Sequence, residues 1–324
     1  MNIGIIRIDR MGDMILTLPI IKALKINNSS IKIDVFASAQ NIKIVENFQY
    51  IDRIINTAKS NNNKKKYDLI LNFSPGWKSF FLCLFAHSTK KANIIFTSRY
   101  KNKLYSKILI SFLSKIFFQQ TLIVNRIKRY NNDESIHQTD MMFQLISQCN
   151  LSYNKDIEIE KYLPNKINIK SKKRICLLHL SSRWINEYYS EIDFLKLIDL
   201  IEKKYSLILT SDTTTKQKFS LIYDKFKIID NDNFKKIKET QYITILENLN
   251  FENWIQSIYS ANLVITPECG CSHIAALCKI NTKIIYDPDN MPNMINAEYA
   301  PWKTKYEKYF FNTENLNKLL TKNL

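Results

Sequence analysis

The run Ile3-Gly4-Ile5-Ile6-Arg7-Ile8 predicts a buried β-strand, and Met14-Ile15-Leu16-Thr17-Leu18-Pro19 predicts the start of a helix. Between them lies the polar turn Asp9-Arg10-Met11-Gly12-Asp13. A strand followed directly by a helix begins a βαβ unit, the building block of parallel sheets. The turn is therefore expected at the carboxyl end of the first strand, where such sheets bind their ligands.

The same alternation of short β-branched runs and helical patterns continues along the chain and then restarts, which predicts an α/β protein with two Rossmann-like domains facing a central cleft. The polar stretch Pro164–Lys173 is the best linker candidate. We expect an N-terminal domain over 1–165, a C-terminal domain over 166–312, and a last helix in 313–324 that could return to the first domain. Expected strands are 3–8, 31–36, 53–55, 68–73, 93–96, 174–180, 207–210, 227–229, 244–246, 263–266 and 283–286, and expected helices lie near 14–26, 40–47, 77–87, 104–118, 135–149, 191–203, 213–225, 251–260, 271–279 and 313–322.

Glycine is scarce: the 324 residues contain four, where ordinary usage would give roughly 23. Glycine reaches positive φ at low cost and lets backbone approach a ligand closely. A chain that avoids glycine should keep it where no side chain fits. Gly12 and Gly270 therefore mark two candidate functional segments.

In the first segment, Asp13 is expected at a helix N-terminus on the ligand-binding side of the first strand. It could be an N-cap, because aspartate is a favoured capping residue. It could also be a general base. Arg7 and Arg10 are close enough in sequence to pair with it or to receive an anionic acceptor. A single glycine excludes a G-x-G-x-x-G phosphate loop.

The second segment repeats this geometry, with the strand Leu263–Thr266, the turn Pro267–Gly270 and a helix from Cys271. Backbone N–H groups of Cys271, Ser272 and His273 at the helix start could bind a diphosphate, and Ser272 and His273 could add side-chain hydrogen bonds. An ordinary strand-to-helix turn is the alternative.

Two groups of residues imitate metal sites. Cys269, Cys271, His273 and Cys278 lie close together, but the second Cys-x₂₋₄-Cys pair of a structural zinc site is missing. Asp287-Pro288-Asp289 imitates a D-x-D metal site, with an ordinary loop after the preceding strand as the alternative. We expect no metal at either place.

The formal charge of +17 comes from scattered basic residues, which indicates either a solvated Lys-rich surface or attraction to an anionic partner such as phosphorylated lipid headgroups. The apolar stretch 104–124 is interrupted by Lys107 and Lys115, so it is not expected to span a membrane. Its helical spacing is typical of a core helix or of a basic amphipathic surface that docks on a membrane. No signal peptide is visible and the six cysteines have no regular spacing, so we expect a cytoplasmic protein.

Three motifs together resemble glycosyltransferase family 9, the lipopolysaccharide heptosyltransferases. Arg7-Ile8-Asp9-Arg10-Met11-Gly12-Asp13, continuing to Leu18-Pro19, matches the family's R-x-D/S-x-x-G-D start. Glu268-Cys269-Gly270-Cys271-Ser272-His273-Ile274-Ala275-Ala276 is similar to its D-T/S-G-x-x-H-x-A-A element, and Asn250–Ile255 to the lead-in before it. His179-Leu180-Ser181-Ser182-Arg183-Trp184 matches at the head of the second domain.

The resemblance implies a GT-B fold and an inverting, metal-independent transfer without a cofactor. Asp13 would be the base, and Arg7, Arg10 and Gly12 would face the acceptor. The donor, ADP-heptose, would be held by Ser181, Ser182, Arg183 and residues 268–273: Glu268, Cys269, Gly270, Cys271, Ser272 and His273. The acceptor would be the lipid A–core of lipopolysaccharide, reached at the inner-membrane surface, with no role for nucleic acid.

The chain departs from the family pattern where Glu268 replaces Asp and Cys269 replaces a small hydroxyl residue, and the Lys usual after the serine pair is absent, so Arg183 would supply that charge. Another nucleotide-sugar donor or surface-glycan acceptor is therefore an alternative. A basic protein that binds nucleic acid or membrane without catalysis is the more distant one.

Overall fold

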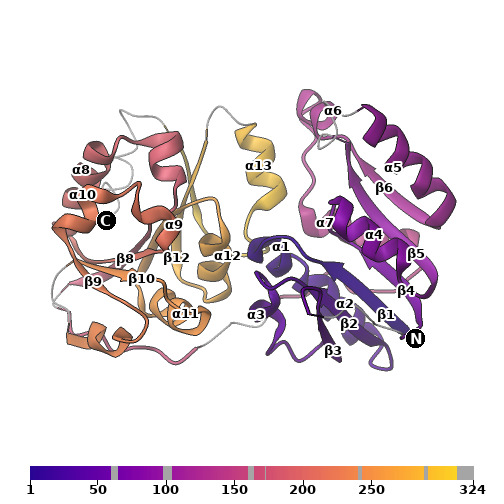
Figure 1. Cartoon of the computed structure of the whole chain (residues 1–324), viewed down its shortest axis with the longest axis horizontal. Coiled ribbons are helices and arrows are strands. Elements are labelled where there is room, and N and C mark those ends of the chain that lie inside the picture. The colour runs from indigo at the N-terminus through magenta and orange to yellow at the C-terminus, as the bar shows by residue number, and fades with distance from the viewer. Residues whose placement is uncertain are drawn as a thin grey trace. The chain divides into compact units, whose positions relative to one another are not determined.

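The computed structural model describes residues 1–59, 65–97, 104–159, 164–171, 173–239, 243–287 and 291–311 (Figure 1). The chain divides into two compact units. The first comprises Met1–Ile159 with Ala297–Ala300, and the second comprises Glu160–Asn296 with Pro301–Leu324. The helix expected near 313–322 lies outside the described residues. Within the described residues, no helix is both long enough and apolar enough to cross a membrane.

The first unit is built on a parallel six-stranded sheet in the order β3-β2-β1-β4-β5-β6. Buried aliphatic runs such as Ile3–Ile6 are typical of parallel strands covered on both faces. Its strands are β1 (Asn2–Arg7), β2 (Lys32–Ala37), β3 (Arg53–Asn56), β4 (Tyr67–Asn72), β5 (Ser88–Phe96) and β6 (Gln120–Val124). Its helices are α1 (Met11–Ile15), α2 (Leu18–Asn27), α3 (Ile42–Val45), α4 (Trp77–Phe85), α5 (Leu104–Phe117), α6 (Arg126–Asn131) and α7 (Gln138–Gln148).

The second unit is built on a parallel seven-stranded sheet in the order β13-β12-β11-β7-β8-β10-β9. Its strands are β7 (Arg174–His179), β8 (Tyr205–Ser211), β9 (Lys227–Ile229), β10 (Thr244–Glu247), β11 (Leu263–Pro267), β12 (Asn281–Tyr286) and β13 (Glu307–Phe310). Its helices are α8 (Glu191–Glu202), α9 (Thr213–Lys216), α10 (Ser220–Lys225), α11 (Phe251–Ser260) and α12 (Gly270–Leu277), together with a π-helix at Trp184–Tyr188 and a 3₁₀-helix at Phe234–Glu239. A further helix, α13 (Pro292–Tyr299), ends in residues that belong to the first unit.

Both sheets are doubly wound, and each has a central strand at which the winding reverses. In the first, β1 pairs with β2 on one side and with β4 on the other. In the second, β7 pairs with β8 and with β11. Right-handed crossovers then place successive helices on opposite faces, which opens a crevice at the carboxyl ends of these central pairs. The two glycine segments follow β1 and β11, so both lie at such a switch point.

The structure corrects several sequence-based expectations. The helix expected over 14–26 is two helices, α1 and α2, because Pro19 lacks an N–H and its ring clashes with the carbonyl four residues earlier. The helix near 213–225 is likewise split into α9 and α10. The elements β6, β13, α6 and α13 were not expected.

The expected role of glycine in positive-φ backbone is wrong, because none of the four glycines has positive φ. Gly4 instead serves packing: a Cβ there would lie 3.2 Å from the ring of Phe36 and 3.3 Å from Ile70, closer than nearly all real Cβ contacts. Left-handed backbone is taken up by other residues, among them Asn150, Asn248 and Lys279.

Candidate functional site

In the first unit, a buried arginine holds the carboxylate of Asp13. Arg7 is the last residue of β1 and is 1% exposed. Its Nη2 donates to Asp13 Oδ1 over 2.9 Å, and its Nε donates to the Asp13 carbonyl over 3.2 Å. Its Nη1 donates to the carbonyl of Phe73, just after β4. The guanidinium therefore bridges the two strands of the switch point and fixes the position of Asp13.

Asp13 is the third residue of α1, not its N-cap as one interpretation had it; the N-cap is Arg10. The backbone N–H of Arg10 donates weakly to Asp13 Oδ2 over 3.4 Å. The side chain of Arg10 is exposed and that of Asp13 is partly exposed. Oδ2 is thus the carboxylate oxygen less occupied by the described contacts, and it is the one that a reacting group can approach.

Buried polar groups support the loop before α1. Asn41 is fully buried and its Nδ2 donates to the carbonyls of Arg7 and Asp9 over 3.0 Å each. The backbone N–H of Ile8 donates to Ser74 Oγ over 2.8 Å. Because each bond joins the loop to a different element, the turn between β1 and α1 is held from both sides.

Three residues that no sequence motif indicated also belong to this region. Glu298 is fully buried and pairs with Arg126 Nε over 2.8 Å, and Arg126 also donates to the Tyr299 hydroxyl. Burial raises the pKa of Tyr299, Arg126 opposes this rise, and the negative charge of Asp13 adds to it. The Tyr299 hydroxyl therefore lies within electrostatic reach of Asp13 and stays protonated at neutral pH.

In the second unit, the candidate segments after β7 and β11 meet through an ion pair. Arg183 Nη1 donates to Glu268 Oε2 and to the Glu268 carbonyl, each over 2.8 Å. Glu187 lies 3.8 Å from Arg183 Nε. Burial works against the charged guanidinium, but these carboxylates outweigh it, so the pKa of Arg183 is raised. Arg183, which the sequence predicts to bind phosphate oxygens, is therefore already paired with Glu268, another residue predicted to bind the donor.

Two serines directly precede Arg183 in the turn after β7. Ser181 and Ser182 are half-buried, and Ser181 Oγ accepts weakly from the Arg183 N–H over 3.4 Å. Trp184 is fully buried and its indole N–H donates to the His179 carbonyl over 2.8 Å. This indole anchors the turn between β7 and the π-helix.

The segment from Cys269 to His273 is less open than expected. Cys269 is the N-cap of α12 and Gly270 begins the helix. Cys271, Ser272 and His273 are all buried, and the Ser272 hydroxyl donates to the Cys269 carbonyl over 2.7 Å. The Ser272 hydroxyl is therefore already bonded within the turn, and Gly270, which is half-buried, is the more accessible residue of the helix start.

The cysteine thiols of this segment stay protonated at neutral pH. Burial raises the pKa of Cys269, and it raises that of Cys271 well above the usual range. Among the described residues, no three His, Cys, Asp or Glu side chains are grouped as a metal site requires. Asp287 is described, whereas its D-x-D partner Asp289 lies outside the described residues.

Comparison with known proteins identifies the fold. No family model matches this sequence, and no curated protein matches it. Three solved structures are similar over nearly the whole chain. A family 9 glycosyltransferase from Veillonella parvula superposes with a TM-score of 0.69 at 15% identity, covering 95% of this chain and 85% of that one.

The other two are from Escherichia coli. Heptosyltransferase WaaC, solved with ADP, gives a TM-score of 0.68 at 16% identity and covers 99% of this chain and 98% of that one. ADP-heptose lipopolysaccharide heptosyltransferase II gives 0.68 at 12% identity, with 99% and 97% covered. The chain thus has the GT-B fold of the family 9 heptosyltransferases, as its motifs predicted.

Proposed function

We propose that this protein is an inverting glycosyltransferase that moves a sugar from a nucleoside diphosphate to a hydroxyl group of a glycan acceptor. The observation that carries the proposal is the carboxylate of Asp13, held by buried Arg7 at the switch point of a GT-B N-terminal sheet. Ligands of doubly wound sheets bind at this place. The fold likeness to heptosyltransferases supports the same class of reaction.

In this reaction the acceptor hydroxyl oxygen attacks the anomeric carbon while the bond from that carbon to the diphosphate oxygen breaks. The hydroxyl proton passes to Asp13 Oδ2, and the nucleoside diphosphate leaves with the bonding electrons. Arg7 orients the carboxylate and does not take part in the proton transfer. The cation of Arg126 and the neutral Tyr299 hydroxyl are suited to hold polar groups of the acceptor near Asp13.

The leaving diphosphate is assigned to the second unit. The start of α12 at Gly270 offers a backbone N–H group and the positive end of a helix dipole. Arg183 can bind two phosphate oxygens at once when it exchanges Glu268 for the ligand. Ser181 and Ser182 flank the same turn and supply hydroxyl donors. This arrangement stabilises negative charge as it develops, with no metal in the proposed scheme.

ADP-heptose is the proposed donor and the lipid A–core of lipopolysaccharide the proposed acceptor. The resemblance of the motifs supports this pair, and WaaC, the protein solved with ADP, has the same fold. The pairing of Glu268 with Arg183 favours testing other sugars as well, because this glutamate stands where the family usually has aspartate. The donor screen should therefore compare ADP-, GDP- and UDP-sugars by thermal shift, since a bound donor raises the melting temperature.

The decisive experiment separates the two halves of the reaction. In Asp13→Asn, we expect transfer to fall by roughly 10²–10⁴-fold while ADP binding is unchanged, because the base is lost and the nucleotide site is intact. In Arg183→Gln, we expect ADP binding to weaken by about tenfold or more, the size of a lost charged hydrogen bond. Transfer is measured as ADP release, and binding by calorimetry.

Asp9→Asn is the matched control, because Asp9 lies 3.8 Å from the Arg7 guanidinium against 2.9 Å for Asp13. Its transfer rate should stay close to that of the unaltered protein. Full activity in Asp13→Asn would refute the assigned base. Absence of heat with every nucleotide, together with salt-sensitive RNA binding, would replace the enzyme by a basic binding protein.

A further inference from the structure

Helix α5 presents an apolar stripe to solvent. Tyr105 is 88% exposed and Phe112 is 59% exposed. At 3.6 residues per turn, the exposed apolar residues of this stripe fall within an arc of roughly 100°. They are Tyr105, Ile108, Leu109, Phe112 and Ile116. The opposite side of the helix, with Ile110 and Ser114, is buried, so α5 is apolar on its outer side as well.

The neighbouring helix α4 adds exposed aromatic rings on the same face of the sheet. Phe80 of α4 and Phe118, just after α5, share one core cluster, and their ring centroids are 5.1 Å apart. On the outer side of α4, Phe81 and Phe85 stack with centroids 6.1 Å apart, and Phe85 is 80% exposed. We call the exposed residues of the two helices the α4–α5 surface. They are Phe81, Phe85, Tyr105, Ile108, Leu109, Phe112, Ile116 and Phe117.

This arrangement contradicts the interpretation of the stretch 101–120 as a purely core-facing helix. A core helix would bury Ile108, Leu109 and Phe112, and the structure exposes all three. Large apolar side chains gathered on one exposed face mark an interaction site rather than an ordinary surface.

The stretch of sequence that contains these two helices carries charge of one sign. Between Asp68 and Asp133 the sequence contains eleven Lys and Arg residues and no Asp or Glu. Lys78 on α4 and Lys115 on α5 are both exposed. A surface that combines apolar side chains with exposed lysines is complementary to a layer that is apolar inside and anionic outside.

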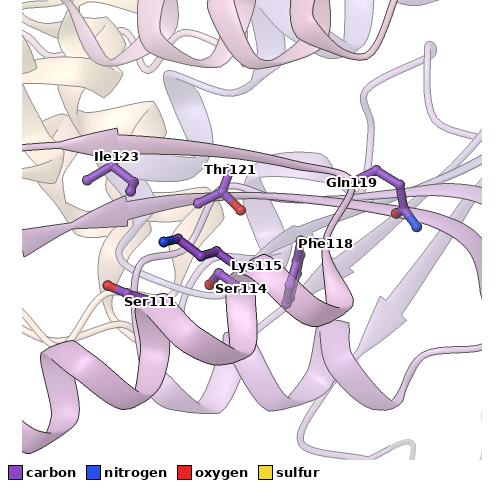
Figure 2. A pocket seen from close by; sticks show the side chains of 7 residues that line it. All are labelled: Ser111, Ser114, Lys115, Phe118, Gln119, Thr121 and Ile123. Atoms are coloured by element: carbon purple, nitrogen blue, oxygen red, sulfur yellow. The ribbon is translucent and has the colours of Figure 1, made fainter.

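A hollow lies beside the stripe. It has a volume of about 270 Å³ and lies between α5 and the edge strand β6 (Figure 2). Its lining is mainly apolar, and the ammonium group of Lys115 is the charged group in it that can meet an anionic headgroup where the helix meets the interface. The lining residues are Ser111, Ser114, Lys115, Phe118, Gln119, Thr121 and Ile123.

We propose that the α4–α5 surface docks this protein on an anionic phospholipid bilayer, with its apolar side chains in the interface and its lysines at the headgroups. The helix lies in the membrane plane and does not span the bilayer. A docking surface of this kind brings the first unit to a lipid-linked acceptor. The proposal stands on these side chains alone and does not depend on the transfer reaction.

The test is sedimentation of the full chain with vesicles of phosphatidylcholine, with and without phosphatidylglycerol. We expect binding to the anionic vesicles that weakens as salt is raised. In the double variant Phe112→Ser with Ile116→Ser, we expect at least about tenfold weaker binding, because two large side chains no longer enter the interface. In Lys115→Glu, binding to anionic vesicles should weaken and become less sensitive to salt.

The matched control is Ile192→Ser on α8, because Ile192 is 60% exposed, like Phe112, but lies in the other unit. It should bind vesicles like the unaltered protein. Equal binding of the double variant and the unaltered protein would overturn the proposal. So would a dimer, seen by light scattering without lipid, that the double variant loses, because the surface would then be a contact between copies. Binding of RNA that the double variant loses, without binding of vesicles, would also overturn it.

Discussion

The two switch points carry the same pair of charges in different settings. In the first unit, Arg7 is 1% exposed and is bonded to the carboxylate of Asp13, to the Asp13 carbonyl and to the Phe73 carbonyl. In the second, Arg183 is 32% exposed and bonds only Glu268 at hydrogen-bond distance among the described acceptors. One arginine is part of the core and the other lies at the surface of a crevice.

This difference in exposure and bonding indicates different functions for the two arginines. A guanidinium locked by three bonds holds its carboxylate in one position, as a group that must meet a reacting atom requires. A partly exposed arginine whose hydrogen-bonded carboxylate is itself partly exposed can exchange that carboxylate for a phosphate at little cost, because water already screens the pair. The first pair is suited to orient a base, and the second to bind and release a charged ligand.

Removing each arginine in turn tests most directly whether the two pairs differ. In Arg7→Met, we expect the free energy of unfolding of the first unit to fall by about 3 kcal/mol, because Asp13 and the Phe73 carbonyl lose a buried charged partner. In Arg183→Met, the second unit should lose less than about 1 kcal/mol. Urea unfolding followed by circular dichroism measures both losses.

Arg126→Met tests whether burial of the ion pair decides how much stability is lost. The partner of Arg126, Glu298, is fully buried and belongs to the same unit as Arg7. The loss in Arg126→Met should be closer to that of Arg7→Met than to that of Arg183→Met. Equal losses for Arg7→Met and Arg183→Met would show that the two pairs do not differ as the contacts indicate.

A smaller effect concerns one histidine in each unit. Burial lowers the pKa of His179, at the end of β7, to about 4. Burial also lowers the pKa of His137, whose Nε2 donates to the Ala300 carbonyl while Nδ1 accepts from the Thr139 N–H. Both rings are therefore neutral in the folded state, and a proton on Nδ1 of His137 would break the cap of α7.

These lowered pKa values determine the sign of the pH dependence of stability. An unfolded histidine has a pKa of about 6.5, so between that value and the lowered folded-state pKa the unfolded chain binds more protons. Stability is full above about pH 6.5 and falls as the pH drops, by about 1 kcal/mol near pH 5.5 for His179 and in the same direction for His137. His179→Gln and His137→Gln should each flatten the fall between neutral pH and pH 5.5 in urea unfolding. An unchanged slope in either variant would contradict the lowered pKa of that ring.

The core of each sheet could be predicted from sequence because the central strands are buried on both faces and read as Ile, Leu and Val runs. The edge strands β6 and β13 could not, since they are short and half exposed, and only pairing with a distant neighbour makes them strands. Helical periodicity found α5, but it did not reveal which of its two apolar sides faces solvent.

The contacts of the candidate site also differ in whether the sequence could predict them. Arg7 and Asp13 are six residues apart in sequence, so the turn itself suggests their contact. Arg183 and Glu268 are 85 residues apart and meet only because β7 and β11 are neighbours in the sheet. Tyr299 belongs to no motif, and its place near Asp13 follows from the end of α13, whose last residues belong to the first unit.

The smallest expected effect compares the ends of two helices, α7 in the first unit and α12 in the second. The residue after each C-cap is left-handed: Asn150 has φ of 56° and Lys279 has φ of 54°. Both ends are Schellman motifs, in which the N–H of Leu151 donates to the Ile146 carbonyl and that of Ile280 to the Ala275 carbonyl. The hydrogen bonds are alike, so only the residue in the strained position differs.

Asparagine tolerates left-handed backbone, whereas lysine does so at a cost of about 1 kcal/mol. Lys279→Gly should therefore raise the free energy of unfolding of the second unit by about 0.5–1 kcal/mol, part of the relief being offset by the freer unfolded chain. Asn150→Gly, the matched variant, should change that of the first unit by only a few tenths. Both changes are measured as shifts of the urea concentration at the midpoint of unfolding, with the dependence of the unfolding free energy on urea unchanged. A loss of stability in Lys279→Gly would mean that contacts of the lysine side chain outweigh the strain of its backbone.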